Sequence, residues 1–320
     1  MKIVIAGRAD AQDLAELRKM YPQVEFVVAA HSGHEDSDAV LQALPDADVL
    51  YIHTVTPEMH RVSKSLRWVQ SQGAGVEWLA DAPEFAASDV TLTNTRGAHA
   101  GTIAEHAFGL LLSLTRCLPE LRQAQESHRW HKPSHPVGLS GLTYGVIGLG
   151  NIGRALAKRA SGFEMRVVAV DANDVPKPDH VARLARLDAL DTLLREADVI
   201  AVATPLTPET RGMLGAAQLE QMKSSAFLVV VSRGGIVDEA ALAEALRAGK
   251  LAGAALDVTS EEPLPAESPL WDAPNLLLTP HCSGASRQTR EMAWGIFVEN
   301  IARFVRGEAL QNVVDKRRGY

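Results

Sequence analysis

One stretch, residues 143–171, most constrains what this chain can fold into. An apolar run leads into three glycines, a helical pattern follows, and a second apolar run ends on Asp171. In a strand–turn–helix–strand unit of this kind, Gly148 allows the tight turn, and Gly150 lets backbone approach a pyrophosphate. Gly153 lets the helix pack closely on its strand. The stretch therefore predicts a dinucleotide-binding unit.

The two residues after the second glycine and the acid at the end of the stretch carry the expected cofactor contacts. A helix beginning at Asn151 and Ile152 would direct its first-turn N–H groups at phosphates, because the helix dipole favours negative charge there. Asp171, about 20 residues on, would accept hydrogen bonds from a ribose 2′-OH and repel a 2′-phosphate. No basic residue follows before Lys177, so NAD is favoured over NADP. A solvated strand end is the alternative interpretation of Asp171.

Length, charge and cysteine content exclude several classes of protein. A chain of 320 residues is long enough for two domains. Its net charge of −7 argues against nucleic-acid or membrane partners, and no apolar stretch approaches the ~18 residues that span a bilayer. Cys117 and Cys282 lack metal-ligand spacing and are too few for a disulfide framework. The opening MKIVIAG is too short for a signal peptide. We expect a cytoplasmic protein without a metal site.

Short apolar runs alternate with helical patterns in the first part of the chain. Strands are expected at residues 2–6, 24–29, 47–53, 66–70 and 90–94, and helices at residues 11–20, 37–44 and 57–65. Strands separated by helices imply parallel pairing with right-handed crossovers. This part therefore predicts a first, smaller α/β domain.

The second part predicts a complete doubly wound sheet. Residues 99–118, ended by Pro119, form an apolar helical pattern that suits burial between domains or subunits, and residues 126–140 indicate a loop. After residue 171, strands are expected at 198–204, 227–232, 252–258 and 276–279, and helices at 187–195 and 239–248, which makes six strands. The last helical pattern, residues 286–306, is longer than this sheet needs. We expect residues 99–284 to form the dinucleotide-binding domain and residues 1–98 with 285–320 a discontinuous substrate domain.

Candidate chemical groups follow the strands of the second sheet. Ligands bind beyond the carboxyl ends of parallel strands, where Arg233, Asp257 and His281 stand. An arginine can bind a carboxylate bidentately, and a histidine can take a hydroxyl proton as hydride leaves for a nicotinamide. Together with an acid, these groups are what oxidation of a hydroxy acid requires. A helix contact for Arg233 and a packed histidine at His281 are the alternatives.

Five motifs, in this order and spacing, resemble the D-isomer-specific 2-hydroxyacid dehydrogenases: GLTYGVIGLGNIGRALA, TPLTPETRGMLG, VSRGGIVDEAAL, ALDVTSEEPLP and TPHCSGAS. SQGAGVEWL and NTRGAHAGTIAEHAFGLLLSLTR are similar to that family's segments too, so the resemblance covers roughly residue 70 to the end. It implies a Rossmann dinucleotide-binding domain, a smaller flavodoxin-like substrate domain, and closure of the two over a cleft. It also implies a homodimer with the helix of residues 99–118 at the contact.

The resemblance assigns the site residue by residue. The substrate arginine is Arg233, the acid/base is His281, and the acid is Glu262, next to Pro263, rather than Glu261. Further contacts are implied for the cofactor from Thr204, Pro205 and Asp257, and for the substrate carboxylate from the backbone N–H groups of Ala74 and Gly75.

The resemblance implies an NAD-dependent oxidoreductase that interconverts 2-keto acids and D-2-hydroxy acids, with glyoxylate, hydroxypyruvate and larger keto acids all open. Formate dehydrogenases carry an amide where Glu262 stands, and phosphoglycerate dehydrogenases often carry an added C-terminal domain. An NAD(H)-sensing regulatory protein of the corepressor type is the alternative. His99 is interpreted as a helix-start residue or a substrate contact, and Trp130 as a loop anchor or a contact to a neighbouring subunit's site. His106 is interpreted as a structural or surface residue.

Overall fold

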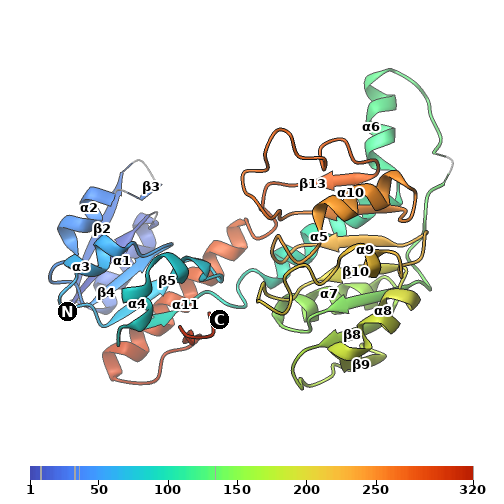
Figure 1. Cartoon of the computed structure of the whole chain (residues 1–320). Helices are drawn as coiled ribbons and strands as arrows, with labels where there is room; N and C mark the ends of the chain where they lie inside the picture. Colours follow the sequence, from blue (N-terminus) through green and yellow to red (C-terminus); the bar gives the residue numbers. More distant parts are fainter. Residues whose placement is uncertain (8, 32–33, 36, 134, 320) are drawn as a thin grey trace. The chain divides into compact units, whose positions relative to one another are not determined.

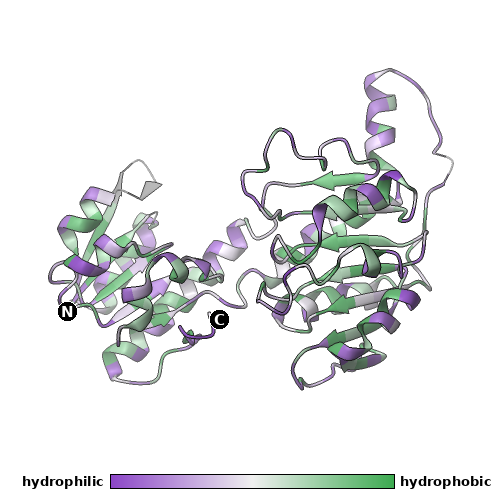
Figure 2. Cartoon of the chain, in the orientation of Figure 1, coloured by the Kyte–Doolittle hydropathy of each residue, from purple (hydrophilic) through white to green (hydrophobic). Residues whose placement is uncertain are grey.

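The computed structural model describes residues 1–7, 9–31, 34–35, 37–133 and 135–319. The chain divides into two compact units (Figure 1). The terminal unit consists of Met1–His99 together with Arg287–Tyr320, and the central unit of Ala100–Ser286. Each unit is built on one sheet, and the inner strands of both sheets are strongly hydrophobic (Figure 2).

The terminal unit has the sheet order β3-β2-β1-β4-β5-β6. The strands are β1 (Lys2–Ala6), β2 (Glu25–His31), β3 (His34–Glu35), β4 (Val49–Ile52), β5 (Trp68–Ser71) and β6 (Thr91–Thr93). The helices are α1 (Ala11–Met20), α2 (Ser37–Ala43), α3 (Pro57–Val62), η1 (Glu77–Asp81), α4 (Pro83–Ala87) and α11 (Arg287–Arg306). All pairs are parallel except β2 with β3. The parallel strands follow the flavodoxin-like order, which confirms the predicted fold of this part.

The C-terminal helix α11 completes the core of the terminal unit. Phe297 and Ile301 pack in one buried cluster with Ile3 and Ile5 of β1. Beside them, the buried side-chain amide of Asn300 donates to Gln70 Oε1 at 3.1 Å. Because these contacts join the two ends of the chain, the terminal unit is discontinuous in sequence.

Tyr51 of β4 gives the terminal unit a specific sensitivity to alkaline pH. Its ring stacks on Phe297, and burial raises the pKa of Tyr51 to about 12 from 10.0. A raised pKa contributes stability below pH 10 that is lost as the pH rises toward 12, because only the unfolded chain then ionises freely. We expect the loss from Tyr51 to reach about 1.4 kcal/mol near pH 11. Urea unfolding at about pH 9 and pH 11 should show a smaller loss for Tyr51→Phe than for wild type.

The central unit is a seven-stranded parallel sheet with the order β13-β12-β11-β10-β7-β8-β9. The strands are β7 (Thr143–Ile147), β8 (Arg166–Asp171), β9 (Arg183–Arg186), β10 (Val199–Val202), β11 (Phe227–Val230), β12 (Gly253–Leu256) and β13 (Leu276–Leu278). The helices are α5 (Ala100–Thr115), α6 (Leu118–Glu126), α7 (Asn151–Gly162), η2 (Leu187–Ala189), α8 (Leu190–Glu196), α9 (Ala216–Leu219) and α10 (Glu239–Arg247). Counted from β7, the order is the doubly wound 3-2-1-4-5-6 with one added strand, which confirms the Rossmann prediction.

Two elements of the central unit differ from the sequence predictions. Strand β9 was not expected, because its segment RLAR has an arginine at each end and forms a partly exposed edge strand rather than an apolar run. Residues 99–118 were expected to form one helix, yet α5 ends at Thr115 and Cys117 turns the chain with φ 56°. Pro119 then lies in the first turn of α6, where its missing N–H costs nothing. The proline therefore starts a second helix inside a region expected to be the end of the first.

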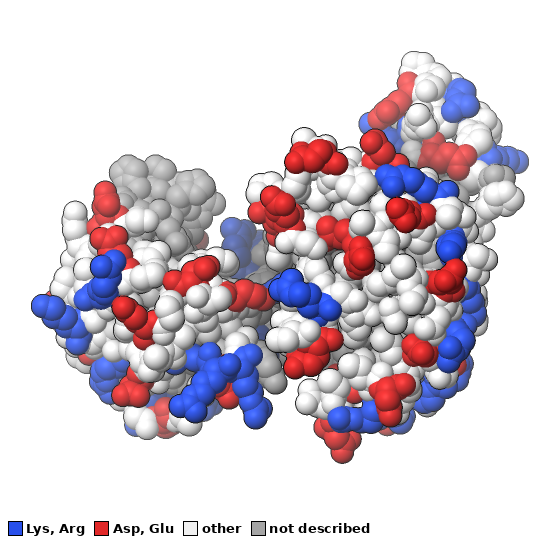
Figure 3. Space-filling model, viewed as in Figure 1, with Lys and Arg blue, Asp and Glu red and all other residues white. Residues whose placement is uncertain are grey.

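The surface of each unit mixes both signs of charge. Acidic and basic side chains are interspersed over the visible face (Figure 3). Within the described part of the chain, no helix has both the length and the apolar character needed to cross a bilayer.

Candidate active site

The turn between β7 and α7 needs two of its glycines for packing. Gly148 has φ +92°, and a Cβ there would lie 2.9 Å from the backbone nitrogen of Thr204. A Cβ on Gly153 would lie 1.9 Å from the carbonyl oxygen of Gly148. These close approaches hold the turn against the end of β10 and the helix against its own strand.

At Gly150, in contrast, no close approach of another described residue requires a glycine. Its φ of −73° suits any residue, and a Cβ there would meet no atom of the described residues within 4 Å. Helix α7 starts directly after it without a side-chain cap and without an acid in its first turn. Open space beside uncapped N–H groups, including those near Asn151 and Ile152, fits the pyrophosphate of a dinucleotide.

We therefore expect different results when Gly153 and Gly150 are each changed to alanine. Gly153→Ala should lower the free energy of unfolding by about 1–3 kcal/mol, because α7 must move off β7. Gly150→Ala should leave thermal stability at or slightly above wild type. It should nevertheless weaken NADH binding, measured by fluorescence titration, because the methyl group occupies the phosphate space. Equal NADH affinity in Gly150→Ala and wild type would contradict a phosphate at this turn.

Asp171 ends β8 beside the glycine turn and is 9% exposed. Its Oδ2 accepts from the backbone N–H of Leu149 at 2.7 Å, and its Oδ1 accepts from that of Asn173 at 2.8 Å. Each carboxylate oxygen retains a further lone pair that can accept from a hydroxyl. Lys177, the first basic residue after Asp171, donates to the carbonyl of Val181. The carboxylate is thus held rigidly at the edge of the turn.

His281 and Glu262 form a direct pair at the carboxyl ends of β13 and β12. His281 Nδ1 lies 2.7 Å from Glu262 Oε2, and the two side chains are 45% and 39% exposed. A carboxylate can only accept, so Nδ1 carries the proton and Nε2 is left to face a ligand. Glu262 Oε1 accepts from the backbone N–H of Thr259 at 3.1 Å, which fixes the carboxylate in turn. The arrangement is that of an oriented acid/base.

Arg233 follows β11, the next strand in the same sheet. Its Nη1 donates to the carbonyl of Ser232 at 2.7 Å. The following residue, Gly234, would bring a Cβ to within 1.9 Å of the carbonyl oxygen of Thr259. Only glycine fits there, because the loop after β11 lies directly on the loop that carries Glu262. The structure therefore brings the three predicted catalytic residues to three adjacent strand ends.

Asp257, at the end of β12, is fully buried, unlike His281 and Glu262. Its carboxylate accepts from Thr279 Oγ1 at 2.6 Å and from the backbone N–H groups of Cys282 and Ser283 at 3.0 and 2.9 Å. Burial alone raises the pKa of Asp257, but these hydrogen bonds outweigh burial and hold its pKa below the ordinary value. Its predicted contact with the cofactor stays a prediction.

One group of potential metal ligands stands out among the described residues. Atoms of His106, Asp257 and Cys282 lie within 4.8 Å of one another. Burial and the charge of Asp257 raise the pKa of the Cys282 thiol, which disfavours a thiolate ligand or nucleophile. His106 Nε2 is itself hydrogen-bonded to Thr279 Oγ1 at 2.9 Å. The expectation of no metal site stays a prediction. The place of His106 was missed because it comes from α5, far away in sequence.

The loop after β5 in the terminal unit carries the predicted carboxylate contacts. Asn94 Nδ2 donates to the carbonyl of Ala74 at 2.7 Å, and Thr95 N donates to that of Gly73 at 3.1 Å. The N–H groups of Ala74 and Gly75 receive no acceptor from the described residues. Two successive N–H groups without an acceptor suit an anionic ligand.

The remaining predicted residues lie in different surroundings. Thr204 is half-buried behind Gly148, and Pro205 is exposed after it. His99 is half-buried directly before α5. Trp130 is 98% exposed in the loop after α6.

Known proteins are similar to this chain in sequence. Residues 108–283 match the family model described as "D-isomer specific 2-hydroxyacid dehydrogenase, NAD binding domain". The chain is 35% identical over 288 residues to the glyoxylate reductase of Korarchaeum cryptofilum, covering 88% of this chain and 84% of that protein. It is 33% identical over 319 residues to the D-3-phosphoglycerate dehydrogenase of Archaeoglobus fulgidus, covering 98% of this chain and 59% of that protein.

Solved structures resemble the chain over its whole length. A D-isomer specific 2-hydroxyacid dehydrogenase family protein from Aeromonas salmonicida has a TM-score of 0.87 at 33% identity, covering 98% of this chain and 99% of that chain. An enzyme of the same description from Xanthobacter autotrophicus, in complex with NADPH and MES, has a TM-score of 0.80 at 32% identity, covering 99% and 100%. These matches extend across both units. The chain belongs to the D-isomer specific 2-hydroxyacid dehydrogenase family.

Proposed function

We propose that Arg233, Glu262 and His281 carry the 2-hydroxyacid dehydrogenase reaction in this protein. The observation that supports the assignment is the 2.7 Å bond between His281 Nδ1 and Glu262 Oε2. In the reductive direction, the protonated His281 ring donates its Nε2 proton to the carbonyl oxygen and becomes neutral. Glu262 stabilises the imidazolium before this transfer and accepts the hydrogen bond from Nδ1. Arg233 binds the substrate carboxylate and polarises the carbonyl. A nicotinamide cofactor bound at the glycine turn would supply the hydride.

The proposed substrates are small 2-keto acids, glyoxylate and hydroxypyruvate, reduced to 2-hydroxy acids. Relatives from Korarchaeum cryptofilum and Thermofilum pendens, 35% and 32% identical, are named glyoxylate reductases. A Sinorhizobium meliloti structure at 28% identity and TM-score 0.82 is named a glyoxylate/hydroxypyruvate reductase. The test is NADH oxidation by the purified protein with glyoxylate, hydroxypyruvate, pyruvate, 2-ketoisocaproate and phenylpyruvate. A preference for phenylpyruvate would contradict the proposal, and a product of L configuration would contradict the D-specific assignment.

The corepressor alternative receives no support from these relatives, whose names are those of enzymes. Tight NADH binding with silence across the whole keto-acid panel would be required to revive it.

We further propose that NAD is preferred to NADP, although the related structures from Xanthobacter autotrophicus and Sinorhizobium meliloti carry NADPH and NADP. The support is the Asp171 carboxylate beside the glycine turn, which would repel a 2′-phosphate. Asp171→Asn removes the charge and keeps an acceptor oxygen. It should raise the ratio of kcat/KM with NADPH to kcat/KM with NADH about tenfold or more. The exposed Asp174→Asn is the matched control, and an unchanged ratio in Asp171→Asn would refute the assignment.

In this proposal the terminal unit is the substrate domain and the central unit the dinucleotide-binding domain. The support is that the family model for the NAD-binding domain matches residues 108–283, inside the central unit. Ala74 and Gly75 would then bind the substrate carboxylate from the terminal unit. Asp257, Thr204 and Pro205 would contact the cofactor.

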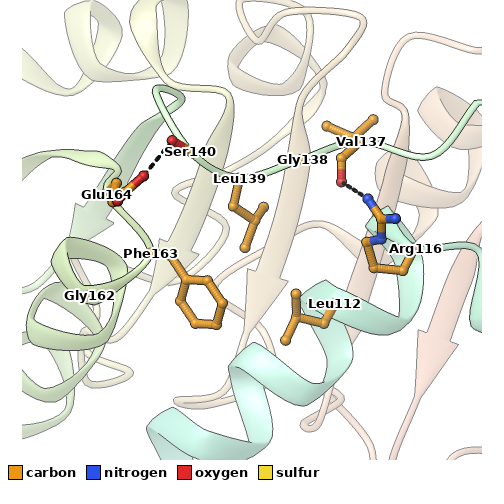
Figure 4. Close-up of a pocket in the computed structure, with 9 residues that line it drawn as sticks. All are labelled: Leu112, Arg116, Val137, Gly138, Leu139, Ser140, Gly162, Phe163 and Glu164. Carbon is orange, nitrogen blue, oxygen red and sulfur yellow. Dashed lines mark hydrogen bonds between the residues drawn. The ribbon is translucent and has the colours of Figure 1, made fainter.

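We also propose a cytoplasmic homodimer. Both cysteines are free, as expected for a reducing compartment. Helix α6 stands away from the rest of the central unit (Figure 1). Trp130, in the loop that follows it, is 98% exposed. A pocket of about 370 Å³ beside α5, with the side chains of Leu112, Leu139 and Phe163 on its wall, offers apolar surface to a second copy (Figure 4). Light scattering should give twice the chain mass, and Trp130→Ala should weaken the dimer. A monomer at all concentrations would refute it.

A further inference from the structure

A chain of hydrogen bonds runs behind the segment that carries His281. His106 Nε2, on α5, lies 2.9 Å from Thr279 Oγ1, and Thr279 Oγ1 lies 2.6 Å from Asp257 Oδ1. The three residues come from a helix and two neighbouring strand ends, all within the central unit. His106 and Thr279 are half-buried and Asp257 is fully buried.

The direction of this chain follows from donor and acceptor counts. A carboxylate only accepts, so the Thr279 hydroxyl gives its single proton to Asp257. The hydroxyl oxygen must then accept from His106, which places a proton on Nε2 of that ring.

The chain ends on the backbone around His281. The side-chain oxygens of Asp257 accept from the N–H groups of Cys282 and Ser283, and its carbonyl accepts from the N–H of His281 at 2.7 Å. His281 has φ 50°, a left-handed conformation that residues other than glycine rarely adopt. Such a backbone persists only where its surroundings hold it. Asp257 contacts this backbone at His281 and at the two residues after it, and the Thr279 carbonyl also accepts from the His281 N–H at 3.0 Å.

We infer that His106 and Thr279 are positioning residues for the reaction, which orient the Asp257 carboxylate and so hold the backbone of His281 in its left-handed conformation. This inference rests on the proposed role of His281 as the acid/base. The Glu262 carboxylate contacts the ring of His281. Asp257 instead holds the backbone, because its carbonyl accepts from the His281 N–H and its carboxylate from the N–H groups of Cys282 and Ser283. Loss of the Glu262 contact removes the hydrogen-bond partner of the ring, whereas loss of the Asp257 contacts moves the whole residue together with its ring.

The test compares two pairs of variants. Thr279→Val removes the hydroxyl at constant shape, whereas Thr279→Ser retains it; His106→Leu removes the donor, whereas His106→Gln can present an amide N–H at a similar place. We expect kcat to fall about tenfold in Thr279→Val and His106→Leu, with KM changed less. The primary isotope effect on kcat with NADH deuterated at the transferred position should rise in these two. Thr279→Ser and His106→Gln should recover most of both values.

Amide hydrogen exchange provides the second readout, which needs no turnover. Peptides covering residues 281–285 should exchange faster in Thr279→Val and His106→Leu than in wild type, while peptides of α7 and β8 stay unchanged. Unchanged exchange at residues 281–285 in both would overturn the inference, as would a drop in kcat that Thr279→Ser does not recover. If wild type is silent on all keto acids, the proposed function fails, and the exchange data still decide the positioning role. If Thr279→Val does not fold, the His106 pair decides the same question.

Discussion

His281→Ala should lower kcat/KM for 2-keto acid reduction by about 10²–10⁴, because the reaction loses the proton donor for the carbonyl oxygen. The loss should fall mainly on kcat, since the imidazole acts as charge develops on that oxygen. NADH affinity should stay close to wild type, because the glycine turn at Gly148 and Gly150 lies after β7 and not after β13.

Two further variants make this expectation specific. His135→Ala, in an exposed loop, should match wild type. Glu262→Gln keeps an acceptor for Nδ1 and removes the negative charge, so its kcat should lie between wild type and His281→Ala. Steady-state kinetics and NADH fluorescence titration measure both quantities. If His281→Ala kept more than about a tenth of wild-type kcat/KM, another residue would have to supply the proton.

Arg233→Ala should raise KM and lower kcat together, reducing kcat/KM by about 10²–10³. The guanidinium would bind the substrate carboxylate in the ground state and polarise the carbonyl as it becomes negative, so both parameters depend on it. Arg233→Lys should recover only part of the loss, because an ammonium group lacks the planar fork. With substrates that lack a carboxylate, kcat/KM should differ far less between the Arg233 variants and wild type.

The control for charge is Arg195→Ala, at an exposed position on α8 where Nη1 donates to Gln221. It should leave kcat/KM unchanged. Near-normal kcat/KM on keto acids in Arg233→Ala would show that a different group binds the substrate carboxylate, and the N–H groups of Ala74 and Gly75 would be the next to examine.

Much of the fold could be predicted because its signals are local. The buried parallel strands are continuous apolar runs, and β1 and α1 occupy the predicted residues. The elements that were missed have weak local signals. Strand β9 is paired only through its edge with β8, and α6 begins at a proline that also suits the end of a helix. In both places the neighbouring structure, and not the residues' own preference, decides the conformation.

The candidate site shows the same division. Gly148, Gly150 and Gly153 could be assigned from sequence because the strand, turn and helix that they serve are consecutive in the chain. Their roles can now be separated, since only Gly148 and Gly153 meet other parts of the protein at close range. The order of Arg233, Glu262 and His281 could be recognised from motifs, because each follows an apolar run at a strand end.

The sequence by itself determined the alternation of strands and helices, the glycine turn and the residue types at the strand ends, because these depend on neighbours along the chain. Only the tertiary structure decided that His106 meets Thr279, which is 173 residues away, and that Gly234 lies against Thr259. Contacts of this kind depend on how the sheet and its covering helices pack, and side-chain periodicity carries no information about which distant residue fills a given space. The hydrogen bonds from His106 through Thr279 to Asp257, behind His281, therefore depend on the packing of α5 against the ends of β12 and β13.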